Sequence, residues 1–405
     1  MRRPDLAEGA SRGALGAQMS ARARYNVRLL DDEMRKLWDL GRNVFLLWCR
    51  RPRGIAVLRM PHENLIRFLA GFGGTRAPAR AAASGEAYLA ELMSQRRAVT
   101  PGELRTAATL LGGDVCELAV PYPQALRQGD AQAIESLVQR YGMNFHTGRA
   151  VVLLDIVDFS LYHPLEQVTQ IHSLSTALNW AHSALLHRRI DVRFARSSTG
   201  DGFYIWNRDT GPRANLHLYH LMHLMLANNA LRRRSAPAGS VPEVKTAFHI
   251  GSYYDIYLAE GLRPASESVI VGNVTVELAR ILGSASPGQI LVGDFTVADP
   301  AGAGDLDSAA FIDRLQETLT ELQGIELLDN RLASLRCYLT GEKREDGSFG
   351  ITRYRVTDKH RRSRDVYNAK VNITPEAGEP IYLGLQNHEV ALPAVTDERV
   401  GELAD

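Results

Sequence analysis

The stretch Val151–Ser160, with the sequence VVLLDIVDFS, decides the fold expected for this chain. Its apolar run from Val151 to Leu154 ends in the carboxylate of Asp155. A short, continuous apolar run is typical of a buried central strand. A charged residue that closes such a run lies at the carboxyl end of the strand, where open α/β sheets bind ligands. The stretch therefore predicts a strand that leads into a ligand site.

A second stretch, Ser198–Trp206 (STGDGFYIW), repeats this logic, with Asp201 in a Gly-Asp-Gly turn. Flanking β-formers predict a hairpin of strands 191–196 and 202–206 with Asp201 at its bend. Two carboxylates on neighbouring strand ends can bind a divalent cation, and Mg²⁺ held by carboxylates and phosphates is typical of nucleotide chemistry. Taken alone, Asp155 is also consistent with a capping residue at a strand-to-helix turn, and Asp201 is also consistent with an ordinary turn residue.

The composition is that of an ordinary globular protein long enough for two or three domains. The chain has 405 residues, of which 45% are hydrophobic and 23% charged, and its net charge is +1. This balance indicates neither a nucleic-acid partner nor an anionic membrane. Cys49, Cys116 and Cys337 are scattered and odd in number, which predicts neither a disulfide framework nor a zinc cluster. No apolar run approaches the ~20 residues of a membrane span, so we expect a cytoplasmic protein.

The pattern along the chain changes at Arg149. Residues 1–24, rich in Arg, Ala and Gly, are expected to be a disordered leader, and residues 25–148 a mainly helical domain. Within that domain, residues 100–113 (TPGELRTAATLLGG) have a passing likeness to a DNA-binding helix-turn-helix. Because basic residues do not cluster on the following helix, a small helical domain is the favoured interpretation. Residues 301–405 are expected to be a C-terminal extension that completes the sheet and ends in a peripheral tail.

Strands and helices alternate from residue 149 onward, which predicts an α+β fold. Helices are expected at about 165–188, 214–232, 272–283 and 310–322, and further strands at 243–250, 253–258, 289–292, 336–340, 351–357 and 366–373. A basic segment, residues 358–364 (DKHRRSR), lies between the last two strands and has no predicted role.

Five pieces, in order across about residues 149–300, resemble the catalytic domain of class III nucleotidyl cyclases, the adenylate and guanylate cyclases. They are LLDIVDFS, STGDGFYIW, KTAFHIG, GNVTVELARI and ILGSASPGQILV. The resemblance implies a ferredoxin-like, palm-type βααββαβ core, with an antiparallel-rich sheet flanked by helices. It also implies a reaction in which the ribose 3′-hydroxyl of a nucleoside triphosphate attacks the α-phosphate and expels pyrophosphate.

The resemblance also assigns roles to residues. Asp155 and Asp201 match the aspartates that hold two Mg²⁺ or Mn²⁺ ions, and the backbone carbonyl of Ile156 would complete one metal site. Arg280 matches an arginine that stabilises the transition state and comes from the opposite subunit, which implies a homodimer. The expected phosphate-binding positions lie in the loop after the first strand and in the hairpin turn: Val157, Asp158, Phe159, Ser160, Gly200 and Gly202.

Three positions depart from the family pattern. Val276 stands where the family has a ribose-binding asparagine, and Ser197 and Val269 stand at the base-selecting positions. Three interpretations remain: a purine read by other residues, such as Arg196, Ser198 or Glu267; a pyrimidine triphosphate substrate; or a nucleotide-binding and dimerisation module without turnover. The metal pair together with the arginine favours an enzyme that forms a 3′,5′-cyclic nucleotide.

Overall fold

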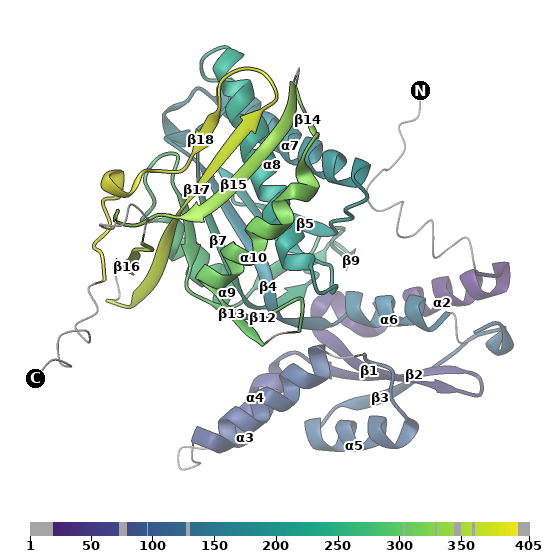
Figure 1. Ribbon diagram of the computed structural model, residues 1–405. Helices are drawn as coiled ribbons and strands as arrows, with labels where there is room; N and C mark the ends of the chain where they lie inside the picture. The colour runs from purple at the N-terminus through teal and green to yellow at the C-terminus, as the bar shows by residue number, and fades with distance from the viewer. Residues whose placement is uncertain are drawn as a thin grey trace, which may run out of the picture. The chain divides into compact units, whose positions relative to one another are not determined.

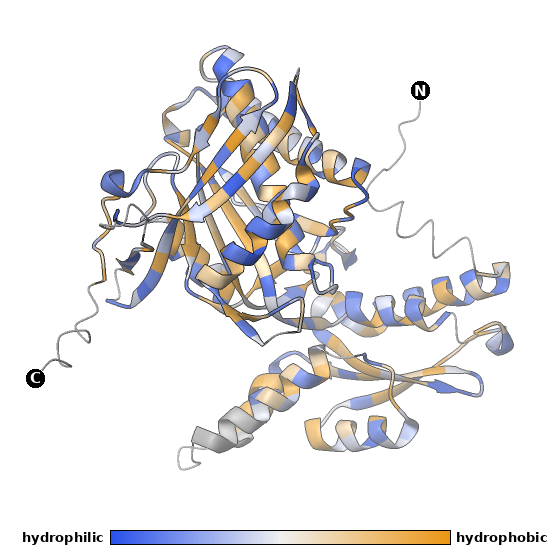
Figure 2. Ribbon diagram, in the orientation of Figure 1, coloured by the Kyte–Doolittle hydropathy of each residue, from blue (hydrophilic) through white to orange (hydrophobic). Residues whose placement is uncertain are grey.

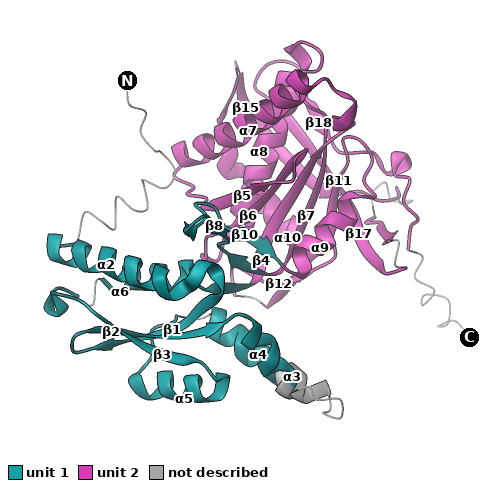
Figure 3. Cartoon of the chain, turned by 180° about the vertical axis from the view of Figure 1, so that it is seen from behind, with its two compact units in different colours: residues 1–146, 254–271 teal, residues 147–253, 272–405 magenta. Residues whose placement is uncertain are grey.

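The structure is a computed structural model that describes residues 19–72, 79–94, 96–126, 130–302, 304–328, 330–343, 350–358 and 361–395. The chain divides into two compact units, and Figure 3 colours them separately. The first unit comprises residues 1–146 and 254–271, and the second comprises residues 147–253 and 272–405. The boundaries fall within two strands, β4 (Met143–Ile156) and β7 (Val244–Ile256).

The first unit is built on a three-stranded antiparallel sheet, in the order β1-β2-β3. Its core forms two clusters, one containing residues of α2 and α6, the other containing residues of α4 and α5. Residues 254–271 add the short strands β8, β9 and β10, of which β10 pairs with the end of β7. The bounds are β1 (Asn43–Arg51), β2 (Gly54–Pro61), β3 (Asp114–Ala119), β8 (Ala259–Glu260), β9 (Arg263–Pro264), β10 (Val269–Val271), α2 (Ala21–Trp38), α3 (Glu63–Phe72), α4 (Ala79–Ser94), α5 (Pro101–Leu111) and α6 (Ala131–Arg140).

This unit differs in two ways from the sequence-based expectation, in its sheet and in residues 21–24. The mainly helical description of residues 25–148 leaves out the sheet β1-β2-β3. The helix-turn-helix, which the sequence disfavoured, is not formed at residues 100–113, because α5 is followed after Gly112 by strand β3 and not by a second helix. Residues 1–18 of the expected leader lie outside the described residues, whereas residues 21–24 belong to helix α2.

The second unit is built around a large mixed sheet with helices, as Figure 1 shows. The main strand order is β14-β15-β17-β11-β7-β4-β6-β5, and β16 and β18 pair with β17. Strands from beyond residue 300 join this sheet through the antiparallel pairing of β17 with β11. The remaining bounds are β5 (Phe194–Ser198), β6 (Gly202–Asn207), β11 (Ile290–Gly293), β14 (Glu326–Leu327), β15 (Asn330–Leu339), β16 (Arg353–Thr357), β17 (Ser363–Pro375) and β18 (Ile381–Leu383), with helices α7 (Pro164–His187), α8 (Ala214–Ser235), α9 (Asn273–Leu282) and α10 (Ser308–Thr318) and a separate two-stranded pair, β12 (Thr296–Ala298) and β13 (Asp305–Asp307).

Strand β4 is the centre of this unit. Alternate residues, among them Val152 and Leu154, enter a core cluster that includes residues of α7, α8 and α10. Val151 and Leu153, on the opposite face of β4, are buried as well. Because both faces of the strand are covered, its sequence is a continuous apolar run and not an alternating one. Figure 2 shows hydrophobic residues along the strands of this unit.

The predicted elements of this unit are formed, with two corrections. The order is β4, α7, β5, β6, α8, β7, so one long helix, preceded by a 3₁₀ turn at Phe159–Leu161, stands where the expected βααββαβ core has two helices. The strands expected at 243–250 and 253–258 are the single strand β7. Gly251, between the two expected strands, allows close packing: a Cβ there would lie 3.1 Å from the Cβ of Val274 on α9.

Among the described residues, no helix combines the length and the hydrophobicity that crossing a membrane requires.

Candidate functional site

The sheet brings the two predicted carboxylates together. Strand β4 pairs with β6 so that Asp155 lies opposite Gly202, and the backbone N–H of Ile156 donates to the carbonyl oxygen of Asp201 at 2.9 Å. The two side chains are close enough for Asp201 to raise the pKa of Asp155, through its charge and through a shared proton. Two acids that are distant in the sequence therefore meet at neighbouring strand ends.

The charge at this site is not balanced by the protein. Burial, the charge of Asp201 and the hydrogen bond to it together raise the pKa of Asp155 from 3.8 to about 6. Lys245, on β7, opposes this rise, since its Nζ lies 3.9 Å from Oδ2 of Asp155. Among the described residues, Lys245 is the one cation that forms an ion pair with either carboxylate, so two acids and one ammonium group leave excess negative charge at the site at neutral pH. A bound divalent cation would remove that excess.

Two glycines shape the hairpin turn beside the carboxylates. A Cβ on Gly202 would lie 1.9 Å from the carbonyl oxygen of Leu154, so only glycine allows β6 to approach β4 here. Gly200 has a φ of 99°, in the region that favours glycine, and its N–H donates to Oγ of Ser198 at 3.0 Å. The hydroxyl of Thr199 donates to Oδ1 of Asp201 at 3.1 Å, which orients that carboxylate.

The loop after β4 offers only part of the expected phosphate contacts. The N–H of Val157 donates to the carbonyl of Glu243 at 3.0 Å, so in this conformation it is not available to a phosphate. Asp158 is exposed and has a left-handed φ of 54°. Phe159 is half-buried and Ser160 is exposed. The exposed part of the loop is therefore the part that a ligand can reach.

Arg280 lies on α9 and is held by the C-terminal part of the chain. Its Nε is 3.1 Å from Oδ2 of Asp358, and Nη1 of Arg364 is 3.6 Å from the same oxygen. Arg364 also forms an ion pair through Nε with Glu277. Within the described part of the chain, no hydrogen bond or ion pair joins Arg280 to Asp155 or Asp201. The family resemblance implies that this arginine acts at the site of a second subunit.

The ribose and base positions lie on three different elements. Val276 stands one helical turn before Arg280 on α9 and is 45% exposed. Ser197 lies on β5 opposite Tyr204 of β6. Val269 begins β10, in the first unit. None of the three offers the amide or charged group that the family pattern has there.

The alternative base-reading residues are differently placed. The guanidinium of Arg196 donates to Oγ of Ser175 at 2.8 Å and lies 5.3 Å from the centroid of the Phe203 ring. Ser198 accepts the turn hydrogen bond from Gly200. Glu267 is exposed.

Three charged residues were missed at the sequence level. Lys245 opens the quoted piece KTAFHIG, and a lysine at the start of a buried strand was the available signal. Asp358 and Arg364 bound the basic segment DKHRRSR, which was noticed without a role. Residues 359 and 360 of that segment lie outside the described residues.

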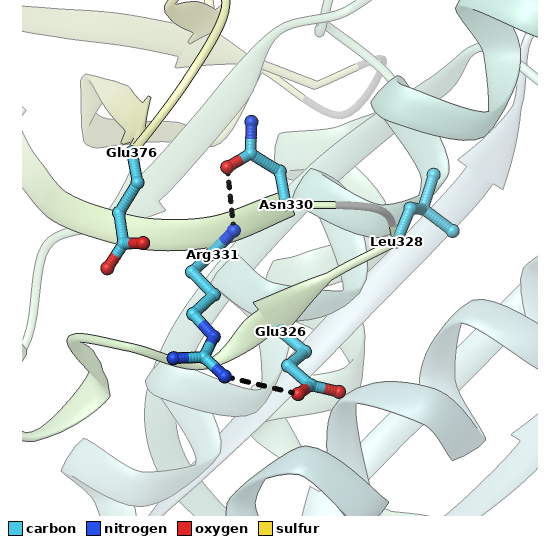
Figure 4. Close-up of a pocket in the computed structure, with 5 residues that line it drawn as sticks. All are labelled: Glu326, Leu328, Asn330, Arg331 and Glu376. Carbon is cyan, nitrogen blue, oxygen red and sulfur yellow. Dashed lines mark hydrogen bonds and ion pairs between the residues drawn. The ribbon is translucent and has the colours of Figure 1, made fainter.

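A hollow of about 470 Å³ lies elsewhere in the second unit, at the β14–β15 hairpin. It is lined by Glu326, Leu328, Asn330, Arg331 and Glu376, all labelled in Figure 4. The guanidinium of Arg331 lies 3.8 Å from Oε1 of Glu326, and its backbone N–H donates to Asn330 at 2.8 Å. None of the predicted site residues lines this hollow, so it is not part of the carboxylate site.

The donors present at the carboxylate site suit a hard cation. They are oxygens, which Mg²⁺ and Mn²⁺ prefer. Within the described ranges, no group of three or more His, Cys, Asp or Glu side chains is placed to hold a metal ion. A cation held by Asp155 and Asp201 would thus need further oxygens, such as the carbonyl of Ile156 and the phosphates of a substrate.

The comparisons with known proteins give a likeness of structure only. No family model matches the chain, and no curated protein matches it. Among solved structures it is similar to the guanylyl cyclase Cya2, with 12% identity over 56% of this chain and 92% of that one, at a TM-score of 0.33. The guanylate cyclase domain of RhGC from Catenaria anguillulae, in complex with GTP, is 11% identical over 58% of this chain and 100% of that one, with a TM-score of 0.33. The adenylyl cyclase CyaB from P. aeruginosa is 11% identical over 56% of this chain and 95% of that one, with a TM-score of 0.31.

Proposed function

We propose that the chain is a metal-dependent nucleotidyl cyclase, which converts a nucleoside triphosphate into a 3′,5′-cyclic nucleotide and pyrophosphate. The observation that carries the proposal is the pairing of β4 with β6, which brings Asp155 and Asp201 to neighbouring strand ends, where Lys245 is the one cation among the described residues that forms an ion pair with either of them. A capping or turn role would explain either aspartate alone, but neither role explains why two acids meet. Excess negative charge at the ends of neighbouring strands is what a cation-dependent phosphate chemistry requires.

Each site residue has a defined task in this proposal. Two Mg²⁺ or Mn²⁺ ions, when bound, lower the pKa of the attacking hydroxyl and neutralise the phosphate charge. Asp155, Asp201 and the carbonyl of Ile156 would hold them. The exposed loop residues Asp158 and Ser160 would offer backbone N–H groups to the phosphates, ahead of helix α7.

Exposed apolar side chains support the homodimer part of the proposal. Val276 is exposed on the face of α9 that carries Arg280, one turn away. Leu161, in the 3₁₀ turn before α7, is 82% exposed, and Leu165 and Val168, in the first turns of α7, are 71% and 55% exposed. A run of exposed large apolar residues marks a protein-contact surface more often than a free one. A second copy of the chain that covers such a surface would bring its own Arg280 to the site.

The proposal includes both purine and pyrimidine triphosphates as substrates. Ser197, Val269 and Val276 lack the groups that the family uses for base and ribose, and each unpaired polar group of a buried base costs ~1–3 kcal/mol. The same three residues favour the second candidate function, a nucleotide-binding and dimerisation module without turnover.

One assay separates the two candidates. The full chain is incubated with each of the four ribonucleoside triphosphates and Mn²⁺, and pyrophosphate and cyclic product are measured, with EDTA as the metal-free control. We expect both products, in equal amounts, from at least one triphosphate, and none with EDTA. Nucleotide binding without pyrophosphate release from any of the four would favour the binding module and exclude the cyclase.

A further inference from the structure

We infer that Asp358, in the C-terminal part of the chain, is a positioning residue for Arg280. The inference rests on the proposed cyclase function and adds to it a residue that lies outside the stretch carrying the family resemblance. Asp358 follows strand β16, and its Oδ2 lies 3.1 Å from Nε of Arg280 on α9. The Asp358 side chain is 8% exposed, so this ion pair is screened little by water.

The contact leaves the reactive end of the arginine available. Asp358 contacts Nε of Arg280, and within the described ranges no partner is recorded for Nη1 or Nη2. The contact is an ion pair, so charge attraction at Nε draws the guanidinium towards Asp358 and leaves its two terminal nitrogens on the other side of the group. The side chain of Arg280 is 23% exposed, which leaves this fork accessible to a phosphate.

Asp358 is itself fixed from two sides. Its Oδ1 accepts from the backbone N–H of Arg362 at 3.0 Å, and its carbonyl accepts from the N–H of Arg361 at 2.9 Å, so the turn orients the side chain. Its Oδ2 also lies 3.6 Å from Nη1 of Arg364. These bonds hold the carboxylate in one orientation, as positioning of a neighbouring group requires.

Strand β17 joins this arrangement to helix α9. Arg364 pairs with Glu277, which lies on α9 less than one turn before Arg280. Two arginines thus face two carboxylates: Arg280, Arg364, Asp358 and Glu277. The charges of the four groups balance, so the cluster needs no ligand to be stable, and its purpose in this proposal is orientation.

The test compares the wild-type chain with Asp358→Asn, using the triphosphate and Mn²⁺ of the assay above. Asparagine keeps the oxygen that accepts from Arg362 and places an uncharged NH2 group where Oδ2 faces Arg280 and Arg364, so the attraction that holds Arg280 is lost. We expect kcat to fall by about 10- to 100-fold with a much smaller change in KM, because a misplaced transition-state group costs rate and not ground-state binding. Asp358→Glu, which restores the charge, is expected to recover part of kcat.

Asp365→Asn is the matched control. Asp365 lies on the same β16–β17 hairpin and pairs with Arg353 and Arg355 at 3.4 and 3.0 Å, away from Arg280. It is expected to keep kcat while showing a similar change in melting temperature. In an Arg280→Ala background, Asp358→Asn is expected to lower kcat no further, since the two residues then act as one unit.

The outcomes are distinct. Equal kcat values for Asp358→Asn and Asp365→Asn, in an active wild type, would overturn the inference and leave the cyclase function intact. A kcat above the wild-type value would overturn it too, because Asp358 would then restrain Arg280. A wild-type chain that forms no cyclic product would overturn the proposed cyclase function, and the inference about Asp358 with it. If Asp358→Asn does not fold, Arg364→Met takes its place, with a smaller fall in kcat expected and an unchanged kcat overturning the inference.

Discussion

The carboxylate pair of Asp155 and Asp201 differs from the arginine cluster of Arg280, Asp358, Arg364 and Glu277 in how its charge is met. In the arginine cluster the protein supplies one carboxylate for each guanidinium. At the carboxylate pair, Lys245 is the one described cation that pairs with either acid, and the pKa of Asp155 is raised to about 6. Balanced charges indicate groups that hold one another in place. Unbalanced charges indicate where the charge of a ligand belongs.

The carboxylate pair should give the largest effect when it is broken. Asp155→Asn or Asp201→Asn leaves the strand pairing in place but removes a cation ligand, so turnover with Mn²⁺ should fall by at least about 10³-fold, equivalent to ~4 kcal/mol of barrier. Initial rates of pyrophosphate release measure this. Asp209→Asn is the control, because Asp209 follows the other end of β6 and pairs with Arg193 at 3.5 Å. Near-normal rates in either site variant would remove the two-metal proposal.

The arginine cluster should give the next largest effect. Arg280→Ala should lower kcat by about 10²- to 10³-fold, the usual cost of losing one donor to transition-state charge. Mixing this variant with Asp155→Asn tests whether the arginine acts across a dimer. Random mixing makes about half of the dimers mixed, each with one complete site, so about a quarter of wild-type activity should return. No recovery, in a mixture shown to exchange subunits, would contradict an arginine supplied by the partner.

The same contrast explains what sequence could predict. Strand β4, the β5–β6 hairpin and helix α9 were predicted because each has a strong local signal: a continuous apolar run, a Gly-Asp-Gly turn and a helical period. That Asp155 and Asp201 meet followed from chemistry, since two acids at strand ends suggest one cation. The metal and phosphate roles of these residues stay predictions.

The contacts of the arginine cluster could not be predicted in this way. Asp358 and Arg280 lie on elements far apart in the chain, and ion pairs between opposite charges are too common on protein surfaces for a pattern to select one. The β16–β17 hairpin, which carries Asp358, joins the sheet because β17 pairs with β11, and no local sequence pattern predicts that pairing. The β1–β2 hairpin was missed for a local reason. The arginines at its turn, Arg50–Arg53, interrupt two apolar runs that are too short to define their type.

The smallest expected effect concerns stability and sharpens the contrast at the carboxylate pair. Because the folded-state pKa of Asp155 is about 6 and its usual value is 3.8, the folded protein binds the proton more tightly than the unfolded chain does. Its stabilising contribution is complete below pH 3.8 and is lost as pH rises through about 6. After allowance for solvent screening at a partly exposed group, the free energy of unfolding should fall by about 1 kcal/mol across this window in EDTA.

Urea denaturation from pH 4 to pH 7 measures this fall against two comparisons. Asp155→Asn should remove the fall, whereas Asp209→Asn should keep it. Saturating Mn²⁺ should reverse it in the wild type, since a cation that binds only the folded state adds stability once both carboxylates are ionised. The arginine cluster already has matched charges, so Asp358→Asn should leave the response to Mn²⁺ unchanged. If the free energy of unfolding of the wild type in EDTA does not change between pH 4 and pH 7, the two carboxylates do not repel each other. The claim that the carboxylate pair, unlike the arginine cluster, carries unbalanced charge would then be wrong.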